Sequence, residues 1–416
     1  MARPIAYLTD IEGRWNKLEA FAASNPYVTI DRDGRINVAD GATFVFGGDA
    51  IDRGAHGRRI VAALLDAKER QPDRVVLLAG NRDINKLRLR RELAGHPPRR
   101  APSEIASAPR GELLRWIFPN TMGARDAFVM RAAELASSGQ AASDEDVAES
   151  FVVDVARDGA IPRYLARCQL AYRGDETLFV HGAVTDASLG VVPGARVATH
   201  DRVDDWIVAL NDWYSAQIDG YRTARDGDDS SAYEGVVAYQ APLPGTRNNQ
   251  ASVVYGRLSD ATNNPHLPSP AVIEQLRKSG VERLVVGHTP CGDAPAILRA
   301  KGFELVCADN SYGRLESGSR IIVNGRELRV VGRARLDDGS DADLSAELTL
   351  DEDASPIGTR DRASGHLVVG RIARGDLLLY KGLDGFRVEQ LAETSDAARA
   401  RSLAPPHQAP FFPEAR

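Results

Sequence analysis

Five short polar motifs, each directly after an apolar run, constrain this sequence more than any of its other features. The runs, at residues 5–8, 43–46, 75–78, 177–180 and 284–286, are each expected to form a short buried strand. Open α/β sheets place ligand sites at the carboxyl ends of their strands, so the motifs are expected to meet at one site. They are Asp10-Ile11-Glu12, Gly48-Asp49-Ala50-Ile51-Asp52-Arg53-Gly54, Gly80-Asn81-Arg82-Asp83, His181-Gly182 and Gly287-His288-Thr289-Pro290.

Amphipathic segments follow the first two motifs. Apolar residues recur at helical spacing from Asn16 to Ser24 and from Arg58 to Arg70. Strand, polar loop and helix therefore repeat along the chain, and this order predicts an α/β fold with a parallel or mixed sheet.

Size and charge limit the classes of function. The chain has 416 residues and a net charge of -6, so it offers no general attraction to a nucleic acid duplex or an anionic membrane. No stretch has the roughly 20 apolar residues of a membrane span. Three cysteines, Cys168, Cys291 and Cys307, form no disulfide framework. These features, and a start too polar for a signal peptide, predict a cytoplasmic protein.

The motifs lie within residues 1–315, which are expected to form the catalytic domain. Segments at about 84–170 and 196–268 interrupt it and are expected to be a helical insertion and an insertion rich in long loops. Residues 316–400 show hairpin patterns and predict a C-terminal β segment, either a small appendage or extra strands on the core. One predicted hairpin turns at Asn324-Gly325. The tail, residues 401–416, is expected to be irregular.

Two groups of polar residues are expected to lie at the surface without a role in the site. The basic stretch Lys86 to Arg91 predicts a solvated helix face, with a phosphate-facing role as the alternative. Most histidines lie in polar or proline-rich surroundings and are expected at the surface: His56, His96, His200, His266, His366 and His407.

The side chains of the motifs suit two divalent metals about 3.5–4 Å apart, which together clamp a phosphoryl group and supply a metal-bound hydroxide. Asp49 is the expected bridging ligand. Asp10 and Glu12 have the spacing to reach one metal, and the other is open to Asn81, His181 and His288. Arg53 has the planar, bidentate geometry that binds phosphate oxygens.

These motifs resemble those of the calcineurin-like metallophosphoesterases, in particular the phosphoprotein-phosphatase branch with its bacterial serine/threonine phosphatases and diadenosine tetraphosphate hydrolases. The likeness covers about 1–90, 171–195 and 281–313 and includes the strand end at Asp309-Asn310. It implies two packed mixed β-sheets flanked by helices, with metals on loops at one end. It also implies metal ligation by Asp10, Glu12, Asp49, Asn81, His181 and His288. Asp49, Asp52, Arg53, Arg82 and Asp83 are the candidate catalytic residues, with Arg53 and Arg82 binding substrate.

Two residues depart from the family pattern. Glu12 replaces a histidine ligand, and the harder carboxylate favours Mn²⁺, then Mg²⁺, over Fe or Zn. Arg82 replaces the histidine that, with its acidic partner Asp83, is thought to protonate the leaving group, and an arginine is always cationic. Another group then donates the proton, or the leaving group needs little help, or Arg82 stabilises charge in the transition state. The remaining alternative is a purely structural ion pair between Arg82 and Asp83.

Three functions follow as hypotheses. The first is a metal-dependent phosphatase acting on phosphomonoesters. The second is a hydrolase of dinucleoside polyphosphates, other pyrophosphates or phosphodiesters, and the third is a binding protein for phosphate ligands that has no turnover. The large insertions favour a phosphorylated small molecule or nucleotide over a phosphoprotein as the substrate. The sequence does not determine the oligomeric state.

Overall fold

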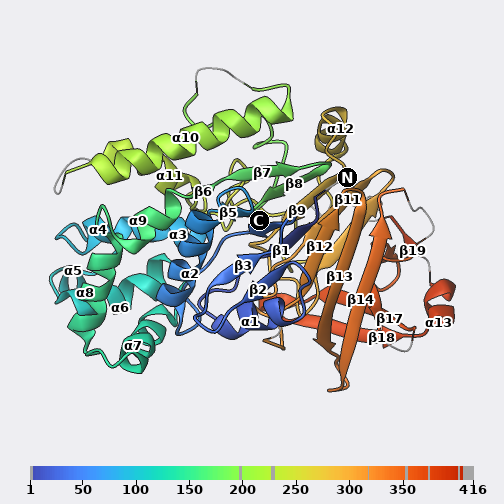
Figure 1. Cartoon of the computed structure of the whole chain (residues 1–416), viewed down its shortest axis with the longest axis horizontal. Helices are drawn as coiled ribbons and strands as arrows, with labels where there is room; N and C mark the ends of the chain where they lie inside the picture. Colours follow the sequence, from blue (N-terminus) through green and yellow to red (C-terminus); the bar gives the residue numbers. More distant parts are fainter. Residues whose placement is uncertain are drawn as a thin grey trace.

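A computed structural model describes residues 3–195, 199–225, 230–316, 318–351, 355–372, 375–401 and 403–405. Two mixed sheets, flanked by helices, form the centre of the molecule (Figure 1). This confirms the predicted fold class. The five predicted strands all form: β1 (Ile5–Leu8), β4 (Thr43–Phe46), β5 (Val75–Leu78), β8 (Thr177–Val180) and β9 (Arg283–Val286).

The larger sheet has the strand order β18-β17-β16-β14-β13-β12-β1-β4-β5-β6, and β15 and β19 lie off this path. Strands β1, β4 and β5 are parallel, so the loops after them leave the sheet at the same edge. The remaining strands of this sheet are β6 (Cys168–Gln169), β12 (Arg320–Asn324), β13 (Glu327–Arg335), β14 (Asp341–Thr349), β15 (Arg360–Asp361), β16 (Leu367–Ile372), β17 (Leu377–Gly382), β18 (Val388–Glu393) and β19 (Leu403–Ala404).

The smaller sheet has the order β10-β11-β9-β8-β7, with β8, β9 and β11 parallel to one another. Its inner face packs on the larger sheet, where the rings of Tyr7 and Phe179 stack with centroids 5.5 Å apart. Its other strands are β7 (Ala171–Gly174), β10 (Ala296–Ala300) and β11 (Phe303–Cys307), and a separate hairpin joins β2 (Val28–Ile30) to β3 (Ile36–Val38).

Helices cover part of the outer faces of the two sheets, whereas exposed residues alternate with buried ones along β13 and β14. Buried side chains of α1 and α2 belong to the same apolar core as the larger sheet, and α10 lies over β7 and β8 (Figure 1). No described helix is both long and apolar enough to cross a membrane, and this includes the longest, α10. The helices outside the first insertion are α1 (Trp15–Ala23), α2 (Gly57–Arg70), α10 (Val203–Thr223), α11 (Glu234–Tyr239), α12 (Pro270–Lys278) and α13 (Ser395–Ala400), with short 3-10 turns η2 (Ser230–Ala232) and η3 (Asp384–Phe386).

The segment 84–170 is helical, as expected, and has an apolar cluster of its own that includes Leu114, Phe118 and Phe151. Figure 1 shows its helices gathered at one end of the molecule. They follow the motif helix α3 (Asn81–Asn85) and are η1 (Lys86–Arg88), α4 (Leu89–Glu92), α5 (Ser103–Ala106), α6 (Arg110–Thr121), α7 (Ala127–Ser137), α8 (Asp144–Val155) and α9 (Ala160–Leu165).

The C-terminal strands extend the larger sheet. Strand β12 pairs antiparallel with β1, so the alternative of extra strands on the core is the one observed. The hairpin between β12 and β13 forms, but Asn324 pairs with Glu327, which places the turn at Gly325-Arg326. In the tail expected to be irregular, Leu403–Ala404 pair with β15, while 402 and 406–416 lie outside the described residues.

Two predictions about polar residues were wrong. The stretch from Lys86 to Arg91 is no solvated face, because Lys86 is fully buried and Arg90 donates to the Tyr221 carbonyl at the end of α10. His366 is buried, not at the surface, because the sheet extension encloses it and its ring lies 2.8 Å from Glu389 Oε2. His407 lies outside the described residues.

Candidate metal centre and active site

The five motifs meet where strands of the two sheets end. The Asp10 amide donates to the Gly48 carbonyl, and the Gly287 amide donates to the His181 carbonyl. The two halves are joined because the His288 amide lies 3.2 Å from Asp10 Oδ2. Loops from both sheets thus form one buried polar site, as the strand pattern predicted.

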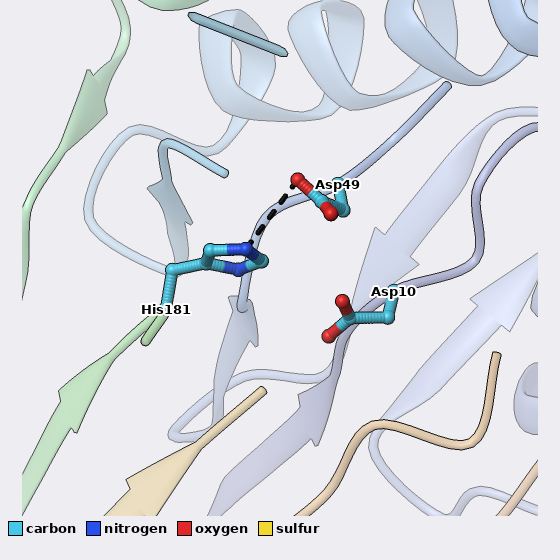
Figure 2. Close-up of side chains that lie close together, drawn as sticks. All are labelled: Asp10, Asp49 and His181. Atoms are coloured by element: carbon cyan, nitrogen blue, oxygen red, sulfur yellow. Dashed lines mark ion pairs between the residues drawn. The ribbon is translucent and has the colours of Figure 1, made fainter. Parts of the chain in front are cut away.

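Asp10, Asp49 and His181 form the centre of this site (Figure 2). All three side chains are buried, and each offers one ligand atom within 4.8 Å of the other two. His181 Nε2 lies 3.4 Å from Asp49 Oδ1, and His181 Nδ1 donates to the Gly47 carbonyl at 2.8 Å. That hydrogen bond fixes the ring and leaves the Nε2 lone pair toward the carboxylates, which is the usual arrangement of a histidine metal ligand.

Asn81 and His288 complete the arrangement. Asn81 Oδ1 lies 3.2 Å from His181 Nε2 and 2.8 Å from His288 Nδ1. His288 Nε2 is buried and has no hydrogen-bond partner in the structure. Two imidazoles, two carboxylates and an amide oxygen therefore face one small volume.

Backbone conformation distinguishes these residues from their surroundings. Five candidate site residues have positive φ angles: Asp10 (51°), Glu12 (48°), Asp49 (57°), Asp52 (110°) and His288 (62°). Such angles are unfavourable for residues with a Cβ, and they concentrate at functional sites where the surrounding fold imposes them. The fold thus imposes left-handed backbone at the loops that present the ligand atoms.

Asp83 shapes the loop that carries Asp49. Its carboxylate accepts hydrogen bonds from the backbone amides of Gly80, Asp49 and Ala50 at 3.1, 3.0 and 2.9 Å. Burial, and then the charge of Asp49, raises the pKa of Asp83 to about 7. Asp83 forms no ion pair with Arg82 among the described contacts, so that alternative is not observed. A catalytic role for Asp83 stays a prediction.

Gly80 allows the close approach of two motif loops. A Cβ atom at this position would collide with the side chain and backbone nitrogen of Asp49. We therefore expect Gly80→Ala to displace Asp49 and to lower metal affinity and activity by at least about tenfold, since small displacements at a catalytic centre are costly. Mn²⁺ titration and initial rates measure this. Gly139→Ala is the control for backbone strain alone, because Gly139 has a positive φ of 70° while no atom lies within 4 Å of the added methyl group, and an equal loss in both variants would contradict the expectation.

Glu12 lies between two arginines and outside the Asp10–Asp49–His181 group. Arg82 Nε is 2.5 Å from Glu12 Oε1, and Arg53 Nε is 3.4 Å from Glu12 Oε2. Arg82 also lies 3.5 Å from Asp49 and 3.6 Å from Asp52. Both arginines carry a buried Nη1 without a hydrogen-bond partner. These Nη1 atoms have spare hydrogen-bonding capacity, although that of Arg82 faces Asp52 Oδ2 at 3.6 Å. Metal ligation by Glu12 stays a prediction.

Asp52 pairs with a residue that the sequence did not single out as functional. Lys86 Nζ lies 2.7 Å from Asp52 Oδ2 and also donates to the Arg82 carbonyl and Asn85 Oδ1. Burial lowers the pKa of Lys86, and the Asp52 charge opposes that shift. The Lys86–Asp52 pair therefore links the second motif to the third.

Sequence reasoning also missed residues that come from irregular loops. Arg257 donates to the His288 carbonyl at 3.3 Å, and the Tyr255 ring lies 4.8 Å from that of His288. The Arg53 guanidinium lies 3.7 Å from the centroid of Tyr312, which stacks on Phe386. No periodicity or motif marks Arg257, Tyr255 or Phe386 in the sequence. Tyr312 lies within the stretch 281–313 of the family likeness, but no role was predicted for its side chain.

Comparisons with known proteins give only distant likenesses. No protein family model matches this chain, and no curated protein sequence matches it. The solved structure of a cold-active protein-tyrosine phosphatase from a psychrophilic Shewanella species is similar, with 16% identity, a TM-score of 0.45 and coverage of 82% of this chain and 80% of that one. A protein serine/threonine phosphatase from Saccharomyces cerevisiae, with similarity to human phosphatase PP5, has 14% identity, a TM-score of 0.36 and coverage of 78% and 73%.

Both neighbours are described as phosphatases. With TM-scores below 0.5 these likenesses carry no weight for the activity of this chain. The function proposed below therefore rests on the side chains of the site.

Proposed function

We propose that this protein is a metal-dependent phosphoester hydrolase that acts on phosphomonoesters. One observation supports the proposal most. A buried group of metal-ligand atoms from Asp10, Asp49 and His181 lies beside two arginines whose Nη1 atoms make no hydrogen bond, that of Arg82 lying 3.6 Å from Asp52 Oδ2. A cation and a phosphate are the two ligands that this juxtaposition suits.

The residues present fit a divalent cation. His288 Nε2, at the edge of the group, has no hydrogen-bond partner, so its lone pair is free to bind a metal ion. Burial, followed by the charges of Asp309 and Asp49, raises the pKa of Asp10 well above its usual value. Buried carboxylates so close together are unfavourable unless a cation neutralises them. A bound divalent ion supplies Lewis-acid polarisation of the phosphoryl group and of water.

The chain itself contributes binding and charge. Arg53 and Arg82 have the fork geometry that holds phosphoryl oxygens and stabilises their charge during transfer. The stacking of Arg53 on Tyr312 limits the orientations of its guanidinium. Arg257, largely buried beside His288, adds a third positive charge from the second insertion.

The third motif has Arg82 in place of the histidine that is thought to protonate the leaving group. This replacement limits the kind of leaving group that the site suits. Arg82 does not donate a proton near neutral pH, and the Asp83 carboxylate accepts hydrogen bonds from three backbone amides, which holds it in the loop of the second motif. We therefore propose substrates whose leaving groups need little protonation, such as aryl phosphates. The same observation favours a second candidate, hydrolysis of phosphoanhydrides such as dinucleoside polyphosphates.

The partners follow as part of this proposal. A phosphorylated small molecule or nucleotide is preferred over a phosphoprotein, because the second insertion reaches the site through Tyr255 and Arg257 beside His288. A cytoplasmic location stays a prediction from the sequence.

The testing experiment measures phosphate release from a series of substituted phenyl phosphates and an alkyl phosphate. For a phosphodiester and a dinucleoside polyphosphate, whose hydrolysis releases no inorganic phosphate, it measures the alcohol or nucleotide products by chromatography. We expect kcat/KM to fall steeply as the pKa of the leaving group rises. An equal rate on the alkyl phosphate would contradict the missing general acid. No product from any substrate, with metal bound, would instead support a binding protein without turnover.

Metal removal gives a separate prediction. Protein stripped by a chelator is expected to lose all measurable phosphate release, and Mn²⁺ is expected to restore it, followed by Mg²⁺, because Asp10, Asp49 and Asn81 offer hard oxygen ligands. Activity assays after dialysis against each ion measure this. Full activity of the stripped protein would contradict the proposal, and restoration by Zn²⁺ alone would contradict the metal preference.

A further inference from the structure

The two departures from the family pattern meet in space. Glu12 and Arg82 are 70 positions apart in the sequence, yet Arg82 Nε lies 2.5 Å from Glu12 Oε1. The Glu12 side chain is 2% exposed and the Arg82 side chain is 12% exposed. Two histidine positions of the family thus hold a carboxylate and a guanidinium that neutralise each other. The two departures are physically coupled, because each residue supplies the nearest opposite charge to the other.

The guanidinium also reaches the carboxylate expected to bridge two metals. Arg82 Nε lies 3.5 Å from Asp49 Oδ2, and the Arg82 backbone amide donates to Asp49 Oδ1 at 2.9 Å. The second oxygen of Glu12 faces Arg53. The side chain of Arg82 therefore lies between Glu12 and Asp49, two of the three residues from which the sequence predicted one of the metal sites.

The other group of ligands remains open. Asp49 Oδ1, on the opposite side of the carboxylate, lies 3.4 Å from His181 Nε2, and Asp10 completes the group of three. Asn81 and His288 lie next to it. Among the described residues, this is the one cluster of three histidine, cysteine or acidic side chains close enough to hold a metal ion.

We propose that the site takes a single divalent ion, at Asp10, Asp49 and His181, and that the Arg82 guanidinium occupies the place of a second ion. This inference rests on the proposed function. The buried Nη1 of Arg82 makes no hydrogen bond and lies 3.6 Å from Asp52 Oδ2, so a phosphoryl oxygen would compete with Asp52 for it. Arg82 is then a substrate-binding cation fixed by Glu12, with a single positive charge where a second metal would bring two.

The test counts bound Mn²⁺ in the intact protein. Equilibrium dialysis with elemental analysis is expected to give one ion per chain, and electron paramagnetic resonance is expected to show the signal of an isolated Mn²⁺. Two ions per chain with an exchange-coupled signal would overturn the inference. The wild-type count decides this even if a variant fails to fold.

Variants locate the cause. Arg82→Met removes the guanidinium that lies between Glu12 and Asp49 and leaves Arg53 as the remaining cation beside Glu12, so this variant is expected to bind a second Mn²⁺. Arg88→Met is the matched control, because Arg88 bonds Glu92 and Thr121 away from the site, and it is expected to bind one ion. A folded Arg82→Met protein that still binds one ion would show that Arg82 does not hold the second ion's place.

Hydrolysis measured on the same samples separates the two proposals. Two bound ions together with hydrolysis would overturn the single-ion inference alone. A bound ion without hydrolysis of any phosphoester would overturn the proposed function, while the ion count would still report on Arg82.

Discussion

Asp49→Asn is expected to lower kcat/KM by about 10³-fold or more, which is the upper range for loss of one preorganised electrostatic group. Asp49 belongs to the ligand group with Asp10 and His181 and also faces the Arg82 guanidinium. Asparagine has almost the same shape and tolerates the positive φ of 57° at this position, so the backbone is expected to be kept. The loss then comes from the missing negative charge, which weakens metal binding and frees Arg82. Steady-state kinetics and a Mn²⁺ titration measure both effects.

The control for this variant is Asp66→Asn. Asp66 lies on α2, where its partly exposed carboxylate pairs with Arg70 Nε at 2.8 Å. Its removal is expected to leave kcat/KM unchanged, because surface ion pairs contribute about 1 kcal/mol or less to stability and this one is away from the site. Wild-type activity of Asp49→Asn would show that the hydrolysis comes from a contaminant, and a binding protein would then be the better hypothesis.

Much of the site could be predicted because its residues are local to strand ends. A short apolar run that stops at an aspartate or histidine is visible in the sequence, and parallel pairing of β1, β4 and β5 brings such ends together without further information. Asp10, Asp49 and His181 were found in this way. The partner of Glu12 could not be predicted. Whether Glu12 faces a metal ion or an arginine depends on the direction of the Arg82 side chain, which the sequence does not show.

The parts that could not be predicted depend on contacts between distant segments. Lys86 lies in a basic stretch, and only the packing of α3 against the second motif shows that it is buried on Asp52. The pairing of β12 with β1 brings together strands that are more than 300 residues apart in the sequence. The hairpin pattern of β12 therefore did not show which strand it pairs with. His366 is buried for the same reason, since the extended sheet encloses a residue with polar neighbours in the sequence.

Lys86→Met is expected to destabilise the protein by about 3–5 kcal/mol, the usual cost when one member of a buried ion pair is removed. Methionine fills a similar volume, so the loss comes from the unpaired Asp52 carboxylate and from the hydrogen bonds to the Arg82 carbonyl and Asn85. Because Lys86 also anchors the loop that carries Arg82, activity is expected to fall under conditions where the variant is still folded. Urea unfolding followed by circular dichroism measures the stability change.

Lys278→Met tests whether burial is the reason. Lys278 Nζ lies 2.7 Å from Glu274 Oε1, the same distance as in the Lys86–Asp52 pair, but its side chain is 72% exposed. Its loss is expected to change stability by less than about 1 kcal/mol, as for exposed ion pairs in general. The double variant Lys86→Met/Asp52→Asn removes both buried charges and is expected to recover part of the stability lost in Lys86→Met. Equal effects of the two lysine variants would mean that Asp52 is satisfied without Lys86, by the Arg82 guanidinium 3.6 Å away, and that the two motifs are held together by the arginine alone.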